Sequence, residues 1–206
     1  METQQQLETR TIDLFDKIDN TELRVAAPEQ PNRLVGYAAV FNSLSQDLGG
    51  FKERIVPGAF KTTVTSGIDV RALVDHDSAK LLGRTSNGTL RIAEDNIGLR
   101  VEIDLPDGVS YADDIRQLVK RGDIRGMSFG FRVRQGGQRF VEEGGIKIRE
   151  LTDIDCRECS VVGQPAYQAT SLALRSIHID PDVLKEIQRP NWSRCSALLR
   201  NSLVKG

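Results

Sequence analysis

The run GMSFGF at residues 126–131 alternates large apolar residues with small ones. A period of two is typical of a β-strand, whose successive side chains point to opposite faces. The methionine and the two phenylalanines would share one face, and Ser128 and Gly130 the other. A packed apolar face would hold the serine rigidly, while the glycine leaves open space beside it. The run suits a nucleophilic hydroxyl, although most serines in strands are simply tolerated polar residues.

Composition excludes several classes of protein. The 206 residues carry 28 Lys+Arg against 29 Asp+Glu, a net charge of −1. Without a basic excess or long charge runs, we expect no nucleic-acid partner. The apolar runs are too short to span a bilayer, so we expect no membrane partner. The polar start METQQQ lacks the layout of a signal peptide, which predicts a soluble protein made in a cytoplasm.

Short strand patterns separated by turn residues dominate the middle of the chain. They are expected at 34–42, 51–56, 69–74, 89–92, 99–105, 127–134, 140–141, 146–151 and 160–163. One short helical turn is expected from Pro57 to Ser66. The clearest helix is Ser110–Arg121, with Ser110 as N-cap, Asp113 three positions on, and Gly122 as its stop. This pattern predicts a mainly β fold with peripheral helices, an α+β barrel or sandwich.

Changes in composition divide the chain into three parts. Residues 1–33 read as a polar N-terminal extension that ends in a proline-punctuated stretch. Residues 34–175 carry the globular pattern, and 176–206 read as an appended helical tail, with caps at Asp180 and Ser193.

Three cysteines fit a reducing compartment better than a disulfide framework. Cys156 and Cys159 form a CxxC, and with His178 and Cys195 they could supply four zinc ligands. Residues three apart on a strand point to opposite faces, so chelation would require a turn here. Structural cysteines without a metal or other cofactor are the favoured interpretation.

A serine hydroxyl needs a general base, and the base needs an acceptor on its second ring nitrogen. Only two histidines are present, and His76 is favoured because it follows a predicted strand of the globular part. Glu158 is a candidate acceptor, with Asp155 and Asp153 as rivals on the same segment. A surface role is the alternative for each of these residues.

Several motifs occur in an order that resembles a known family. They are GYAAVFN (36–42), ERIVPGAF (53–60), DHD (75–77), LGR (82–84), GTL (88–90), GL (98–99), MSFGF (127–131), ECSVV (158–162) and PAY (165–167). The ordered set is similar to that of the prohead (capsid maturation) serine proteases of tailed phages. Each motif alone is weak, but the series covers residues 34–175.

The resemblance implies an assemblin-like fold, a β-barrel surrounded by helices. It implies His76 as base, Ser128 as nucleophile and Glu158 as the residue that orients the histidine, with Asp155 still open. Cys159 stands where the family usually has an apolar residue. Donors for the oxyanion could be main-chain N–H groups near 149–151 or 129–130, or the side chain of Arg125.

The resemblance also implies an activity and partners. The protein would be a serine endopeptidase without cofactors that acts inside assembling proheads in the host cytoplasm. Its partners would be the major capsid protein, through its scaffold segment, and further copies of itself. The two terminal segments could hold self-cleavage sites or target the enzyme to the scaffold. The alternatives are a non-catalytic capsid-assembly or scaffold-binding module on the same fold, and a zinc- or thiol-dependent protein.

Overall fold

The serine-bearing run lies in strand β9 (Gly126–Val133), at the centre of a computed structural model that describes residues 7–12 and 22–163. Met127, Phe129 and Phe131 are fully buried in the main hydrophobic core. The alternation read from the sequence is therefore confirmed, with the apolar side chains on the core face of the strand.

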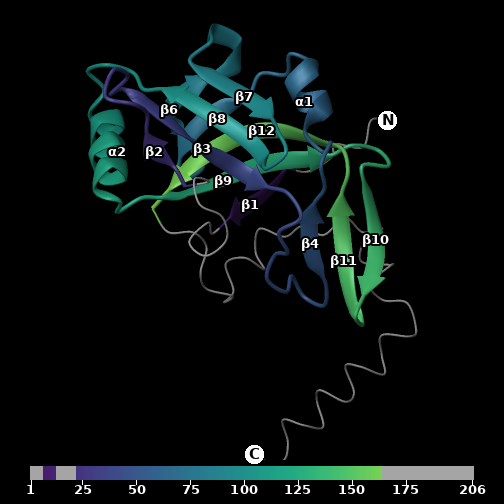
Figure 1. The fold of residues 1–206 in the computed structure, drawn as a ribbon. Helices are drawn as coiled ribbons and strands as arrows, with labels where there is room; N and C mark the ends of the chain where they lie inside the picture. Colours follow the sequence, from purple (N-terminus) through teal and green to yellow (C-terminus); the bar gives the residue numbers. More distant parts are fainter. Residues whose placement is uncertain (1–6, 13–21, 164–206) are drawn as a thin grey trace, which may run out of the picture.

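Strand β9 is part of a five-stranded sheet with the order β1-β9-β12-β5-β6 (Figure 1). The other members are β1 (Glu8–Ile12), β12 (Ile154–Val162), β5 (Arg71–Val74) and β6 (Asp77–Arg84). Strand β12 runs antiparallel to β9 and parallel to β5. Strand β9 therefore lies between β1 and the strand that carries the carboxylate candidates.

The remaining strands form two smaller sheets. The four-stranded sheet contains β2 (Arg24–Val25), β3 (Arg33–Val40), β8 (Gly98–Asp104) and β7 (Leu90–Glu94). The three-stranded sheet contains β10 (Gln138–Glu143), β11 (Ile146–Leu151) and β4 (Lys52–Ile55). The mainly β fold class is confirmed. Over the described residues the strands pair as three sheets and no closed barrel is seen, so the barrel stays a prediction.

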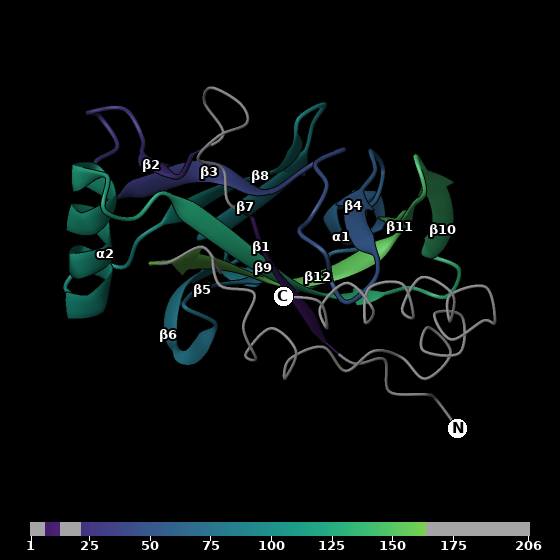
Figure 2. The same ribbon diagram turned by 90° about the horizontal axis from the view of Figure 1, so that it is seen from below.

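Helices are few and short. They are α1 (Lys61–Thr65), α2 (Ser110–Arg121) and the 3-10 turn η1 (Thr85–Asn87). Helix α2 lies at one end of the molecule, opposite the β10–β11 hairpin, in Figures 1 and 2. Its end at left-handed Gly122 is as predicted, but its N-cap is Val109, without a side-chain hydrogen bond, and Ser110 is already helical. The prediction of Ser110 as cap was wrong because the extended residue lies one position earlier.

The core is formed by side chains from both larger sheets. Leu99, Val101 and Ile103 of β8 belong to the same buried cluster as Met127 and Phe129 of β9. A chain of aromatic contacts runs through it, with Phe60 edge-on to Phe129 at 5.7 Å and Phe129 stacked on Phe131 at 5.2 Å between centroids. Such contacts fix the core side of β9, and hence the direction of Ser128.

Parts of the predicted N-terminal extension belong to the sheets. Strand β1 pairs with β9, and β2 pairs with β3. The proposed boundaries at 33 and 175 stay predictions. The helical tail at 176–206, with its caps at Asp180 and Ser193, falls outside the described residues. Within the described residues, no helix is long and apolar enough to cross a membrane.

Candidate active site

His76 lies in a two-residue turn between β5 and β6. Val74 pairs with Asp77, and the two residues between them have positive φ angles of 45° for Asp75 and 60° for His76. Positive φ at both central positions is the type I′ hairpin arrangement, and it is strained for side chains other than glycine. The turn aims His76 at the neighbouring strand β12.

Asp75 fastens this turn to the end of β12. Its main-chain N–H donates to the carbonyl of Val161 at 3.0 Å, and its carboxylate accepts from the N–H of Gly163 at 3.2 Å. These bonds offset the backbone strain and fix the turn relative to β12. Strained residues held in this way are frequent at functional sites.

The imidazole of His76 contacts the carboxylate of Glu158. Nδ1 of His76 is hydrogen-bonded to Oε1 of Glu158, whose side chain is 5% exposed, while the histidine is 30% exposed. A carboxylate on Nδ1 fixes the ring orientation and leaves Nε2 as the proton acceptor. The structure thus brings His76 and Glu158 together as the sequence predicts.

Glu158 reaches the histidine side of the sheet because β12 contains a bulge. Cys156 pairs with Phe131 and Glu158 pairs with Gly130, so Arg157 has no partner in the β9–β12 ladder. One extra residue reverses the facing of every residue beyond it. Glu158 therefore shares a face with Gly130 instead of following Cys156 into the core.

Gly130 makes room for Glu158. A Cβ atom at this position would stand 2.8 Å from Cγ of Glu158 and 2.9 Å from its Oε1. The sequence predicts open space beside the serine at Gly130, and in the structure the Glu158 side chain fills that space. The glycine thus permits the close approach of the carboxylate.

Ser128 and Ser160 lie directly opposite each other in the β9–β12 ladder. Cross-strand partners point to the same face, so both serines share the face of Glu158. The Ser160 hydroxyl donates to Oε2 of Glu158 at 3.3 Å. The two carboxylate oxygens thus have different partners, His76 on one and Ser160 on the other.

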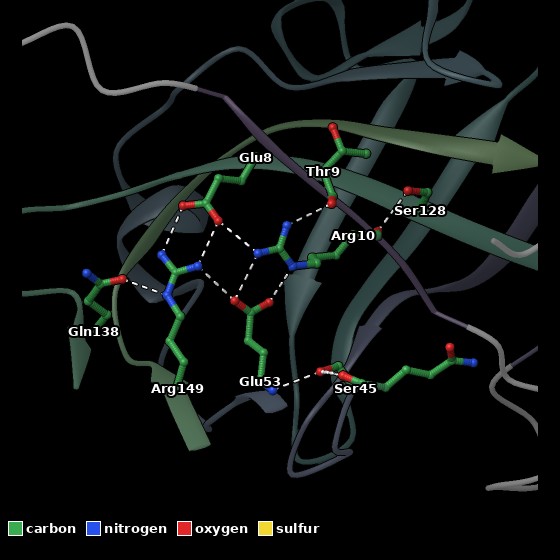
Figure 3. A network of polar contacts seen from close by, with 9 residues as sticks. Glu8, Thr9, Arg10, Ser45, Glu53, Ser128, Gln138 and Arg149 are labelled. Atoms are coloured by element: carbon green, nitrogen blue, oxygen red, sulfur yellow. Dashed lines mark hydrogen bonds and ion pairs between the residues drawn. The ribbon is translucent and has the colours of Figure 1, made fainter. Parts of the chain in front are cut away.

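The Ser128 hydroxyl faces the opposite neighbour, β1. It donates to the carbonyl oxygen of Arg10 at 2.8 Å, and the serine is completely buried (Figure 3). Ser128 is anchored by its core-facing neighbours, as expected, but its hydroxyl meets the main chain of an N-terminal strand. This contact depends on long-range pairing that no local pattern predicts.

The rival carboxylates have other partners. Asp155 accepts from Arg134 at 2.7 Å and from Arg157 at 3.4 Å, and Asp153 lies 3.8 Å from Arg134. Both precede the bulge. Of the three candidates, Glu158 is the one that contacts His76.

The two cysteines of the CxxC lie on the core side of β12. The bulge lets Cys156 and Cys159 face the same way, opposite Phe131 and Phe129, with sulfur atoms 3.9 Å apart. The expectation that they point to opposite faces was therefore wrong. Both are free and buried, which is one of the two placements, solvated or buried, that the sequence left open for structural cysteines.

A reactive thiol is disfavoured at this position. The contact with Cys156 and then burial raise the pKa of the Cys159 thiol, which keeps it protonated. No cluster of metal-ligating side chains occurs among residues 7–12 and 22–163. His178 and Cys195, the other zinc candidates, fall outside that part of the chain.

The three groups of expected oxyanion donors lie in different parts of the fold. The main chain of 149–151 belongs to β11, where it pairs with β10 and β4 in a different sheet. Arg125 donates to the carbonyl of Gly122 at 2.9 Å. The main chain at 129–130 is part of β9, the strand that also carries Ser128.

A cluster of four charged side chains lies beside the serine (Figure 3). Arg149 binds Glu8 and Glu53, and Arg10 binds the same two carboxylates. Burial would raise the pKa of Glu8, but the hydrogen bond and charge of Arg149, and then Arg10, outweigh it and lower that pKa. The cluster is electrically balanced, which allows it to remain ionised where it is partly buried.

Comparison of the sequence with known proteins identifies a family. The profile of the caudovirus prohead serine proteases matches residues 20–182, which include His76, Ser128 and Glu158. The chain belongs to this family. The prohead protease of Enterobacteria phage HK97 is 29% identical over 192 residues, covering 91% of this chain and 79% of that protein. No solved structure gives a significant match.

The match confirms the resemblance read from the ordered motifs. As a member of the prohead protease family the chain is a serine protease of the capsid-maturation class. Sequence reasoning missed Ser160 and Arg10. The alternation E-C-S at 158–160 could have indicated that Ser160 shares a face with Glu158, whereas nothing local links Arg10 to Ser128.

Proposed function

We propose that this prohead-family protease is an endopeptidase that removes the scaffold segment of the major capsid protein and also cuts its own chain. The observation that carries the proposal is the Nδ1 contact between His76 and Glu158, on the sheet face that also bears Ser128. The proposed base, orienting carboxylate and hydroxyl thus come from the β5–β6 turn, from β12 and from β9, and these strands are neighbours in one sheet.

In this mechanism Ser128 is the nucleophile. Its Oγ attacks the carbonyl carbon of the scissile peptide bond while Nε2 of His76 takes the hydroxyl proton. Glu158 holds the ring through Nδ1 and stabilises the positive charge that develops on the imidazole. His76 then passes the proton to the leaving amine, and an acyl-enzyme remains on Ser128. Water deprotonated by His76 releases the acyl group and restores the serine.

The setting follows from the family. We propose that cleavage takes place in assembling proheads in the host cytoplasm, that the major capsid protein is the partner, and that the chain self-associates as a dimer or larger oligomer. An assemblin-like barrel, with the three sheets as parts of it, is proposed as the architecture. Sedimentation of the purified protein would measure its oligomeric state.

The test is co-expression with a capsid protein. We expect Ser128→Ala to abolish shortening of the capsid subunit and self-trimming. Ser86→Ala is the matched control, because Ser86 is exposed in η1 and belongs to a different part of the fold. A serine-directed phosphonate probe should label Ser128 in the active chain. Capsid shortening and self-trimming that persist in the Ser128→Ala chain would show that Ser128 is not the nucleophile, whereas absence of both with the unaltered chain would favour a non-catalytic assembly role on this fold.

A further inference from the structure

Strand β1 occupies the edge of the nucleophile strand. It pairs antiparallel with β9, residue against residue, from Glu8 opposite Phe131 to Ile12 opposite Met127. The carbonyl oxygen of Arg10 in this strand accepts a hydrogen bond from the Ser128 hydroxyl at 2.8 Å (Figure 3). An extended peptide substrate must likewise place a main-chain carbonyl group next to the Ser128 hydroxyl.

The side chains of β1 on the core side are held by a charged cradle, which we define as Glu53 and Arg149. Arg10 donates to both oxygens of Glu53, at 2.6 and 3.0 Å. Arg149 donates to both oxygens of Glu8, at 2.7 and 2.9 Å. Each contact is a two-point, charge-assisted pair, which is geometrically selective.

The cradle is preorganised by its own strands. Glu53 of β4 and Arg149 of β11 are register partners, and both are almost fully buried. Arg149 also donates to Glu53 at 2.9 Å and to the side chain of Gln138 at 2.7 Å. The cradle therefore has fixed positions for one acidic and one basic side chain, two residues apart on an extended chain.

Strand β1 is attached as a bound peptide would be. Its polar residues Glu8, Thr9 and Arg10 are only partly buried, and they are held by main-chain pairing, ion pairs and the contact of Arg10 with the Phe131 ring. Peptides that add a strand to a sheet edge are recognised in this way. Because Ser128 is completely buried with its hydroxyl on Arg10, a substrate that pairs with β9 must displace β1.

We propose that the β9 edge beside Ser128 is the binding site for an extended peptide with an acidic residue followed two positions later by a basic one. The segment Glu8–Ile12 is this chain's own occupant, and it blocks the site until a substrate strand replaces it. The proposal rests on Ser128 being the nucleophile. It adds the substrate class: Glu53 selects the basic residue at the serine, and Arg149 the acidic residue before it.

Electrostatics predicts the direction of selectivity. When β1 leaves, Glu53 and Arg149 remain as a neutral pair, so the empty cradle carries no net charge. A peptide with the acidic and basic residues exchanged would place like charges together at both positions. Such repulsion would discriminate against the wrong ligand in addition to the attraction it loses.

The test measures binding without turnover. A labelled peptide of residues 6–12 is titrated into full-length Ser128→Ala protein and into the same protein with Glu8→Ala and Arg10→Ala added. We expect at least roughly tenfold tighter binding to the second, because its own segment no longer competes. Exchanging glutamate and arginine in the peptide should abolish binding, and adding Glu53→Gln should weaken it by roughly tenfold or more.

A control variant shows whether the change in affinity is specific to the cradle. Arg91→Ala breaks the ion pairs with Glu102 and Asp104 in the other sheet and should leave peptide affinity unchanged. Equal affinity for both peptide orders, or for both proteins, would overturn the proposal. Every protein in this binding experiment lacks the Ser128 hydroxyl, so the measured peptide affinities do not depend on catalysis. A failed capsid-cleavage test would therefore overturn the proposed function without changing these affinities.

Hydrogen exchange of the Ser128→Ala protein provides a second measurement that does not require the β1 substitutions to be tolerated. We expect amides in the β1–β9 ladder to exchange at least roughly 100-fold faster than those in the β9–β12 ladder, because an exchangeable strand opens locally. Equal protection of the two ladders would identify β1 as a permanent strand and overturn the proposal.

Discussion

Gly130 stands directly opposite Glu158 in the β9–β12 ladder, and the space above its Cα is filled by the glutamate side chain. The position of the carboxylate on His76 therefore depends on the absence of a Cβ atom one strand away. This relationship links a core strand to the orientation of the proposed base.

Gly130→Ala should impair the orientation of His76 while leaving the packing of β9 in the core largely intact. The added methyl would lie 2.8 Å from Cγ of Glu158, so the carboxylate must move away from His76. We expect kcat/KM to fall by roughly 100-fold, with only a modest drop in Tm. Gly163→Ala is the control, because nothing lies within 4 Å of a Cβ there and alanine keeps the main-chain N–H that donates to Asp75. Wild-type activity of Gly130→Ala would show that the position of Glu158 is unimportant.

Glu158→Gln should lower turnover far more than Asp155→Asn. The amide keeps the shape of the side chain but cannot stabilise an imidazolium on Nδ1, so we expect a loss in kcat of about 10³-fold. Asp155→Asn breaks an ion pair with Arg134 and should change activity by less than about threefold. Turnover of a scaffold peptide by the purified variants measures both, and equal or reversed losses would contradict the assignment.

Ser160→Ala tests a positioning role. Loss of the hydrogen bond to Oε2 of Glu158 should lower kcat by about fivefold, the effect of one ordinary hydrogen bond, with KM unchanged. Labelling by the phosphonate probe should remain on Ser128, and Ser160→Thr should restore part of the rate. A change in KM alone would instead indicate a role in substrate binding.

Asp104 should make the free energy of unfolding decrease as the pH falls below about 4. A hydrogen bond from Arg91, opposed by burial, and then one from Arg33 lower the pKa of Asp104 from 3.8 to about 2. Since the folded pKa is the lower one, the contribution is complete above the ordinary value and is lost as the pH falls towards 2. Urea unfolding should show Asp104→Asn less stable than wild type at pH 7, and the gap should close near pH 2. A gap that is independent of pH would contradict the linkage.

Chelators should leave the rate unchanged. Cys156 and Cys159 face the core, and burial disfavours a thiolate at Cys159. We expect activity to survive o-phenanthroline and metal analysis to find less than about 0.1 zinc per chain. One tightly held zinc, with activity lost on its removal, would revive the zinc alternative.

Local patterns predicted much of the fold because burial imposes period two on strands. The alternation around Ser128 and the hairpin around Gly144–Gly145 follow from this rule. The position of His76 was predicted only approximately. Its turn requires positive φ at a histidine, which is stabilised by bonds from Asp75 to a strand about 85 residues further along the chain. Such support cannot be read from neighbouring residues.

The contact between the predicted residues His76 and Glu158 is present in the structure, but the geometry that produces it was not predicted. Glu158 was selected over Asp155 through the resemblance, whereas in the structure the bulge at Arg157 separates them. Strict alternation would have placed Glu158 with Cys156 in the core. The pairing of β1 was also missed, because an edge strand is stabilised by the strand it pairs with, and β9 lies far away in the sequence.

The bulge residue Arg157 divides β12 into two segments of opposite phase. Before it, even-numbered positions such as Ile154 and Cys156 face the core, and after it the odd-numbered Cys159 and Val161 do so. Deleting Arg157 would remove the bulge and return the strand to strict alternation, with Cys156 still opposite Phe131 and Glu158 still opposite Gly130. Arg157 is therefore a position in β12 whose removal should leave the other side chains on their present faces, because the pairing with β9, and not the length of the strand, decides which way Glu158 points.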